Sequence, residues 1–306
     1  MTTPSGSAAL ATPSATGLTP AGAAFLAAEV QFAEVGDASM AWRRSGQGPA
    51  LLLVHGFPFH GFAWRHLLPA LSRHYTCYVP DLAGLGDTRW QAGTDFGFEG
   101  HARRLQTLVT ALGLTQYSVL AQDTGATIAR CLARIDSARV RRMALINTEM
   151  PGHRPPWIQE FQASKGLPGS AWFFRQMLRF RFLRRTPLLF GDCFCDLGLL
   201  DGEFHEQFVR PLIGSARRTE GAMHYLMGID WKIVDAMAQW HAGMAMPVLL
   251  VWGRDDPIFP VEWARRMVAQ FADCRGLVEI PGCKVLPHEE KPEAVLAAVL
   301  PFLAER

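Results

Sequence analysis

Asp123 is the residue of this sequence whose type and surroundings most clearly predict chemistry. It ends an apolar, β-prone run at 117–122 and precedes a run at 124–128 that is compatible with a helix. Small residues stand two positions before and after it, Ala121 and Gly125, which is the pattern of a tight strand-to-helix turn that raises one side chain above a sheet. A carboxylate placed there would attack carbon and form an alkyl ester, a reaction suited to epoxides and carbon–halogen bonds rather than to esters.

Such a turn needs a buried strand before it and a helix after it, and the chain contains several further pairs of this kind. Continuous apolar runs predict strands at 50–55, 75–80, 117–122, 140–147, 247–252 and 276–280. Helices are predicted at 64–71, 98–112, 124–135, 261–271 and 291–303. Polar and apolar residues alternate at 29–35 and 39–43, which predicts a hairpin. The repeated order of strand and helix indicates an α/β protein with a mostly parallel, doubly wound sheet.

The alternation of strands and helices stops between residues 149 and 243. Helical stretches rich in aromatic residues and arginines fill this region, so we predict an inserted helical cap at 149–243 and a core formed by 23–148 and 244–306. Caps of this kind usually form a wall of the substrate pocket. Residues 1–22 are rich in Ala, Ser, Thr and Pro and lack the features of a secretory signal, so we expect a disordered leader there.

The composition is that of a globular protein with a large core. Hydrophobic residues make up 49% of the chain and charged residues 19%, and the net charge is +2. This near-neutral balance argues against a nucleic-acid partner, and no apolar run has the length of a membrane span. The six cysteines lack zinc-site spacing, so we expect no metal or cofactor. We expect a cytoplasmic monomer or homodimer with reduced thiols, whose partner is a small-molecule substrate.

Several motifs in chain order resemble those of the α/β-hydrolase family, over roughly residues 28–304. They are His55-Gly-Phe-Pro58, the run Trp64–Leu71, Pro80-Asp-Leu-Ala-Gly-Leu-Gly-Asp87, Gln122-Asp-Thr-Gly125, Trp252-Gly-Arg-Asp-Asp-Pro257 and His288-Glu-Glu-Lys-Pro-Glu293. The branch they resemble most contains epoxide hydrolases, haloalkane dehalogenases and fluoroacetate dehalogenases. This resemblance implies the α/β-hydrolase fold, and a hydrolase that acts on a small, largely apolar epoxide or halogenated substrate through an alkyl-enzyme ester.

The resemblance also implies roles for individual residues. Asp123 is the expected nucleophile, and the backbone N–H groups of Phe57 and Thr124 are the expected donors to developing negative charge. The triad acid is expected at Asp256, with Glu149 as a second candidate because some dehalogenases carry the acid after the preceding strand.

Two positions depart from the pattern of the branch. Dehalogenases commonly have a halide-binding tryptophan or an arginine directly after the nucleophile, where this chain has Thr124. Epoxide hydrolases usually hold the epoxide oxygen with two cap tyrosines, whereas Tyr225 is the only tyrosine in the predicted cap.

The position of the catalytic histidine is a further departure. Alignment on Glu289-Glu-Lys-Pro-Glu293 places Val285 where the family has that histidine, with Lys284 before it. A valine cannot take a proton from water, although hydrolysis of an alkyl ester needs a base. Four substitutes stay open: His288, Lys284 with a lowered pKa, His153 and His224.

Further polar and aromatic residues are candidates for the substrate pocket. His153, Arg154 and Trp157 lie in a rigid, aromatic and cationic motif that could orient an anionic or polar substrate. His55, Tyr225 and Glu149 complete this predicted set.

Two other classes of function remain open because the usual base is missing. In the first, Asp123 acts as an acid or base in a non-hydrolytic enzyme, such as an isomerase, cyclase or decarboxylase. In the second, the chain is a catalytically silent protein that binds a small apolar ligand.

Overall fold

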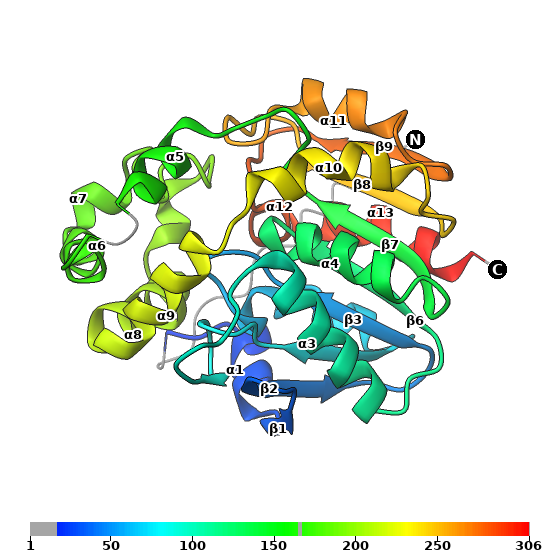
Figure 1. Ribbon diagram of the computed structural model, residues 1–306, viewed down its shortest axis with the longest axis horizontal. Coiled ribbons are helices and arrows are strands. Elements are labelled where there is room, and N and C mark those ends of the chain that lie inside the picture. The colour runs from blue at the N-terminus through cyan, green and yellow to red at the C-terminus, as the bar shows by residue number, and fades with distance from the viewer. Residues whose placement is uncertain (1–16, 165–166, 306) are drawn as a thin grey trace, which may run out of the picture.

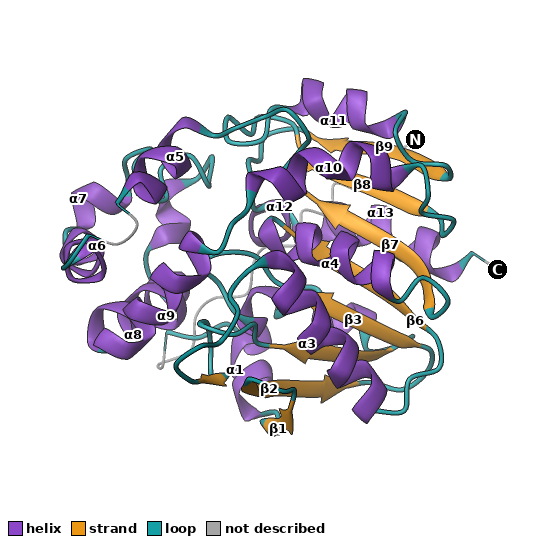
Figure 2. Cartoon of the chain, viewed as in Figure 1, coloured by secondary structure: helices purple, strands orange, loops and turns teal. Residues whose placement is uncertain are grey.

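A sheet of nine strands runs through the described part of the chain, residues 17–164 and 167–305 of this computed structural model (Figures 1 and 2). The strands are β1 (Gln31–Glu34), β2 (Ala38–Ser45), β3 (Ala50–Val54), β4 (Thr76–Pro80), β5 (Arg89–Trp90), β6 (Tyr117–Gln122), β7 (Val140–Ile146), β8 (Val248–Gly253) and β9 (Cys274–Ile280). Their spatial order is β1-β2-β4-β3-β6-β7-β8-β9, and β5 pairs with β2. β2 is antiparallel to β1, β4 and β5, and the other neighbours are parallel.

The helices fall into two groups. Those outside the stretch between β7 and β8 are α1 (Pro20–Ala27), the 3-10 helix η1 (Gly61–Trp64), α2 (Leu68–Leu71), α3 (Phe98–Ala111), α4 (Thr124–Ile135), α11 (Val261–Val268), α12 (Pro287–Glu290) and α13 (Pro292–Ala304). Figure 1 shows α3 and α4 in front of the sheet and α13 behind it. Those between β7 and β8 are α5 (Pro156–Ala163), α6 (Ser170–Arg179), α7 (Arg181–Arg184), the 3-10 helix η2 (Leu197–Leu200), the π-helical turn η3 (His205–Val209), α8 (Arg210–Gly214), α9 (Ala216–Met227) and α10 (Trp231–His241).

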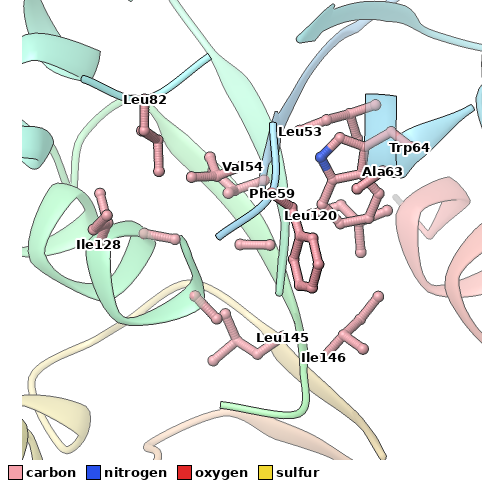
Figure 3. Close-up of a cluster of buried hydrophobic side chains, with 14 of the residues drawn as sticks. Leu53, Val54, Phe59, Ala63, Trp64, Leu82, Leu120, Ile128, Leu145 and Ile146 are labelled. Atoms are coloured by element: carbon pink, nitrogen blue, oxygen red, sulfur yellow. The ribbon is translucent and has the colours of Figure 1, made fainter. Parts of the chain in front are cut away.

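The hydrophobic core lies on both faces of the central strands. Figure 3 shows Leu82 and Ile128 on one side of the strand that carries Leu120, and Ala63 and Trp64 on the other. A parallel strand that is covered on both faces needs apolar side chains at successive positions. This requirement is the reason why continuous apolar runs marked the central strands in the sequence.

The register of the central strands brings their following loops to one edge of the sheet. Leu53 of β3 pairs with Leu120 of β6, which pairs in turn with Ala144 of β7. Leu145 of β7 pairs with Leu250 of β8. Because these strands are parallel, their carboxyl ends lie side by side, where open α/β sheets bind their ligands.

The predicted α/β class with a mostly parallel sheet is confirmed. Strand 117–122 and helix 124–135 coincide with β6 and α4. The continuous helix predicted at 64–71 is wrong, because the segment divides into η1 and α2. Pro69 has no N–H to donate, so a helix running through it would lose a backbone hydrogen bond.

The predicted leader, 1–22, extends too far into the chain. Residues 1–16 lie outside the described residues, but α1 begins at Pro20. The hydroxyl of Thr19 accepts the N–H of Gly22 over 3.0 Å and caps this helix. Glu203 accepts the backbone N–H of Thr19 over 2.9 Å. Composition could not reveal this contact, since its partner lies 184 residues away in sequence.

The inserted helices do not all stand apart from the sheet. Figure 1 shows α5 to α9 beside the sheet, whereas α10 lies against α4. The Arg134 guanidinium lies 4.3 Å from the ring centre of Trp240, and Nη1 of Arg130 lies 3.4 Å from Nε2 of His241. The helices that lie beside the sheet therefore cover fewer residues than the predicted cap range 149–243, because α10 packs against α4. Of the helices that the structure describes, none combines the length and apolar character needed to cross a membrane.

Candidate active site

The turn between β6 and α4 holds Asp123 in a backbone conformation that few residues adopt. Its φ is 54° and its ψ is −137°. A Cβ atom on Gly125 would lie 2.2 Å from the carbonyl oxygen of His55, and one on Gly56 would lie 2.5 Å from Cβ of Asp123. The turn and the loop after β3 therefore approach each other so closely that both positions require glycine.

The carboxylate of Asp123 is held by donors from two loops. The backbone N–H of Phe57 donates to its Oδ2 over 2.8 Å. The hydroxyl of Thr124 donates to the same oxygen over 3.3 Å, and the hydroxyl of Tyr225 donates to Oγ1 of Thr124 over 2.9 Å. The structure therefore brings Phe57 and Thr124 next to Asp123, and their role as donors to developing negative charge stays a prediction. Tyr225 of α9 reaches Thr124 from the inserted helices but does not line the cavity, contrary to what the sequence had predicted for it.

The surroundings of Asp123 favour its protonated form more than water does. Burial raises the pKa of Asp123 well above its ordinary value, and the negative charge of Glu149 raises it further. Hydrogen bonds from the backbone N–H groups of Phe57 and Thr124 oppose this rise, because they stabilise the carboxylate. The site therefore contains a poorly solvated carboxylate with specific donors.

Asp123 lines a cavity of about 50 Å³ in which apolar side chains predominate. Its lining consists of Phe57, Pro58, Phe59, Gln122, Asp123, Thr124, Ile158, Phe161, Phe174, Leu188, Leu189, Phe190, Cys193, Leu226, Ile229, Ile258, Phe259 and Val285. The polar side chains in this set are Gln122, Asp123, Thr124 and Cys193. Few polar groups are therefore available to take part in a reaction at Asp123.

Val285 lines this cavity beside Asp123 and is buried. Its carbonyl oxygen accepts the side-chain amide of Gln122 over 3.3 Å. No histidine is among the described residues that line the cavity. The base that would activate water at an Asp123 ester is thus absent from this lining.

Asp256, the expected acid, is buried in the loop after β8. Its Oδ2 accepts the side-chain amide of Asn147 over 2.7 Å, and its Oδ1 accepts the N–H groups of Ile258 and Phe259 over 2.7 and 3.1 Å. Burial raises the pKa of Asp256 to about 7. Within the described part of the chain, its hydrogen-bond partners include no histidine.

Glu149, the second candidate acid, is buried behind the turn. Its Oε2 accepts the hydroxyls of Thr127 and Thr148 over 2.6 and 3.1 Å. The Arg130 guanidinium donates to the carbonyl oxygen of Glu149 over 2.8 Å. Burial raises the pKa of Glu149. Glu149 does not line the cavity, so its influence on Asp123 is electrostatic.

His288, proposed as a substitute base, lies away from the cavity, and that assignment needs correction. Its ring packs against Trp64, with the ring centres 5.2 Å apart. Both ring nitrogens are buried and have no hydrogen-bond partner in the described structure. Burial lowers the pKa of His288 to about 4. The short helix α12 turns this side chain into the core, which the sequence alone did not indicate.

His55, predicted to line the pocket, instead supports the loops around it. Its Nε2 accepts the N–H of Leu82 over 2.9 Å, so Nδ1 carries the proton and donates to the carbonyl oxygen of Gly56 over 2.9 Å. Burial lowers its pKa to about 4. His55 is therefore neutral and positions the loop that carries Phe57, without lining the cavity itself.

His153 and Arg154, two residues of the predicted cap motif, are also held outside the cavity. His153 contacts the carbonyl oxygen of Ile258 over 2.7 Å through Nε2, and Arg154 pairs with Asp235. Trp157 lies in α5, but its side chain is outside the described part of the structure. Neither His153 nor Arg154 can orient a substrate at Asp123 in this conformation.

The remaining substitutes for the base, Lys284 and His224, contact other groups. Nζ of Lys284 donates to the carbonyl oxygen of Gly191 over 3.2 Å. The ring of His224 stacks on Phe96, with the ring centres 5.2 Å apart, and about half of its side chain is exposed. Neither residue lines the cavity.

Cys193 and Gln122 are cavity residues that the sequence analysis did not identify. Burial raises the pKa of the Cys193 thiol, and the charges of Asp256 and Asp123 raise it further. Gln122 directly precedes the nucleophile position, which was the one available signal for it. Cys193 lies between α7 and η2, and no spacing in the sequence relates it to Asp123.

Residues that could hold a metal ion are not grouped in the described structure. Over residues 17–164 and 167–305, no three His, Cys, Asp or Glu side chains lie together in such an arrangement.

Comparisons with known proteins show which family and relatives the chain is similar to. A family model described as the alpha/beta hydrolase fold matches residues 49–292. A soluble epoxide hydrolase of Corynebacterium sp. (strain C12) is 32% identical over 284 residues, which is 85% of this chain and 92% of that protein. A haloalkane dehalogenase of Bradyrhizobium diazoefficiens is 33% identical over 303 residues, with 90% and 94% covered. A cis-3-alkyl-4-alkyloxetan-2-one decarboxylase of Shewanella oneidensis is 27% identical over 267 residues, with 79% and 81% covered.

Proposed function

The chain belongs to the α/β-hydrolase family, and from that premise we propose that Asp123 is the nucleophile of a covalent reaction with a small, largely apolar epoxide or halogenated compound. The observation that carries the proposal is the position of Asp123, whose Oδ2 accepts the N–H of Phe57 while the residue lines an apolar cavity. The similarity to an epoxide hydrolase and a haloalkane dehalogenase supports both substrate classes.

The first half of the reaction needs no base. A carboxylate oxygen of Asp123 attacks an electrophilic carbon, an ester C–O bond forms, and the carbon–halogen bond or one C–O bond of the epoxide breaks. A halide leaves as an anion, whereas the epoxide oxygen must receive a proton. Thr124 lines the cavity and passes its proton to that oxygen while it takes one from Tyr225, which becomes a phenolate and carries the charge that Asp123 has lost. Burial raises the pKa of Tyr225, so this proton must return to the phenolate before the next reaction.

The second half of a hydrolysis requires an activated water. Water would add to the carbonyl carbon of the Asp123 ester and lose a proton to a base. The motif alignment predicts Val285 at the position of the family histidine, and the amide of Gln122 cannot accept a proton. We therefore expect the alkyl ester on Asp123 of the natural chain to form faster than it is hydrolysed. The ester should then accumulate.

A second candidate follows from the same missing base. Decarboxylation of an oxetan-2-one consumes no water, and the relative from Shewanella oneidensis carries that activity in its name. Asp123 would attack the saturated ring carbon that is bonded to the ring oxygen. The bond between this carbon and the ring oxygen breaks, which opens the ring to an Asp123 ester and a free carboxylate. Loss of CO2 then forms the alkene between the two ring carbons and expels the Asp123 carboxylate. Every bond and charge balances without a proton transfer.

Counting products separates these reactions. The chain is incubated separately with a haloalkane, an epoxide and a cis-3,4-dialkyloxetan-2-one. Halide, alcohol, diol, alkene and CO2 are measured per chain, together with the intact mass of the chain. One equivalent of halide followed by arrest supports the first proposal, and continuous release of alkene and CO2 supports the second. Continuous formation of alcohol or diol would show that a base acts at the ester. No product from any of the three, together with an unchanged intact mass of the chain, would contradict a nucleophilic role for Asp123.

A further inference from the structure

A second apolar space, which we call the cap groove, lies among the inserted helices next to the Asp123 cavity. It has a volume of about 680 Å³. Its lining consists of Phe161, Ser164, Leu167, Pro168, Gly169, Ser170, Trp172, Phe173, Met177, Leu183, Leu188 and Met223. Nothing in the chemistry assigned to Asp123 requires this groove.

The cap groove and the Asp123 cavity share part of their lining. Phe161 of α5 and Leu188, which follows α7, line both spaces. Leu188 is 39% exposed, so it is not locked into a packed core. The two spaces are therefore adjacent, with Phe161 and Leu188 at the boundary between them.

The side chains around the groove leave more apolar surface in water than is usual. Leu167 is 61% exposed, Trp172 is 64% exposed and Phe173 is 60% exposed. Exposed apolar groups that gather in one place mark a binding surface more often than scattered ones do. Among the described residues that line the groove none is charged, and the hydroxyl of Ser164 already donates to the carbonyl oxygen of Phe161 over 2.6 Å. An uncharged, apolar ligand fits this lining.

We propose that the cap groove binds the alkyl chain of a long-chain substrate whose electrophilic carbon reacts with Asp123. This inference rests on the proposed function, because it adds a tail to the compound attacked there. The cavity of about 50 Å³ holds only the reacting end of a ligand, whereas the groove of about 680 Å³ has the size of an ordinary ligand site. The substrate class is thus a lipid-like epoxide, halide or oxetanone.

A series of terminal epoxides from 1,2-epoxybutane to 1,2-epoxyhexadecane tests the groove. The second-order rate of labelling at Asp123 should rise with chain length, by about fourfold for each methylene that becomes fully buried. The labelling rate should stop rising when the alkyl chain of the epoxide is longer than the groove. A rate that is flat or falls with length, while short epoxides still label Asp123, would overturn the groove and leave the proposed function standing.

A matched pair of variants locates the effect. Trp172→Ala removes a groove side chain that is 64% exposed, and Phe182→Ala removes an aromatic ring that is 67% exposed and does not line the groove. Trp172→Ala should lower the ratio of long-chain to short-chain labelling rates by about tenfold. Phe182→Ala should leave the ratio unchanged. An equal decrease of this ratio in both variants would mean that the alkyl chains bind to exposed apolar surface in general.

Binding of unreactive 1-alkanols keeps the groove testable without any reaction. Calorimetric titration with 1-dodecanol should show saturable binding that Trp172→Ala weakens and Phe182→Ala does not. Such binding together with no labelling by any epoxide would uphold the groove and contradict the nucleophile. Absence of binding, together with a concentration-dependent dimer that Trp172→Ala dissociates, would assign the groove to a second copy of the chain and overturn the inference.

Discussion

The backbone N–H of Phe57 donates to Oδ2 of Asp123 over 2.8 Å, across the close approach between the loop after β3 and the turn after β6. This bond stabilises the ionised carboxylate, whereas burial and the charge of Glu149 stabilise the protonated form. Reactivity at Asp123 therefore depends on the balance between one specific donor set and a poorly solvated site.

The labelling rate at Asp123 should depend on pH in a defined direction. Only the carboxylate attacks carbon, and the pKa of Asp123 is raised above its ordinary value. The rate should therefore rise as pH increases through that raised pKa and then level off. A haloalkane is the suitable probe because halide release needs no proton. Asp123→Asn should give no labelling at any pH, and a rate that falls with increasing pH would contradict attack by the carboxylate.

Tyr225→Phe should distinguish epoxides from halides. The variant removes the hydroxyl that donates to Thr124, and the epoxide oxygen needs a proton that a halide does not. Labelling by an epoxide should fall by about 10²-fold, while labelling by a haloalkane should change little. Tyr117→Phe is the matched control, since it removes a buried hydroxyl bonded to Asp136 over 2.6 Å, outside the cavity. Equal losses for both probes would assign Tyr225 a structural role only.

Val285→His should restore the second half of the hydrolysis. Val285 lines the cavity with Asp123, and an imidazole there can take a proton from water. Turnover should rise by about 10²- to 10⁴-fold over the natural chain, measured as diol or alcohol formed per chain. Val285→Leu should show no such gain. A folded Val285→His variant without turnover would show that position 285 is not where the ester can be hydrolysed.

Asp256 should make folding stability depend on pH. Its pKa is raised from 3.8 to about 7 in the folded chain, so the folded state keeps a proton that the unfolded state has lost. The stabilising contribution of the Asp256 carboxyl to the free energy of unfolding is complete below pH 3.8. It decreases as pH rises and is lost above about pH 7, a total decrease of about 4 kcal/mol.

Asp256→Asn removes this titration and serves as the comparison. The free energy of unfolding of the variant minus that of the natural chain, from urea denaturation, should increase as pH rises from below 4 to above about 7. A difference that stays constant with pH would mean that Asp256 has the same pKa in the folded and unfolded states.

The central strands and the turn at Asp123 could be predicted because local rules determine them. A strand covered on both faces must be apolar at successive positions, and for this reason the apolar run at 117–122 predicted the strand β6. The small residue Gly125 indicated the tight turn, and in the structure a larger side chain there would overlap the carbonyl oxygen of His55. In both cases the constraint acts within a short stretch of sequence.

The surroundings of Asp123 could not be predicted as fully, because they depend on contacts between distant segments. His288 matched a family motif, yet α12 packs it against Trp64. His55 ends an apolar run in front of a functional loop, yet both of its ring nitrogens bond to backbone groups. Cys193 joins the cavity only through the path of the inserted helices, which no periodicity in the sequence defines.

The most direct test of the account is the intact mass of the chain after reaction with 1,2-epoxydodecane, followed by peptide mapping. We predict a gain of one epoxide per chain, located on the peptide that contains Asp123, stable over hours and absent in Asp123→Asn. In Val285→His the adduct should form and then disappear as diol is released. An unmodified natural chain, or an adduct that persists in Asp123→Asn, would contradict the claim that Asp123 is a nucleophile.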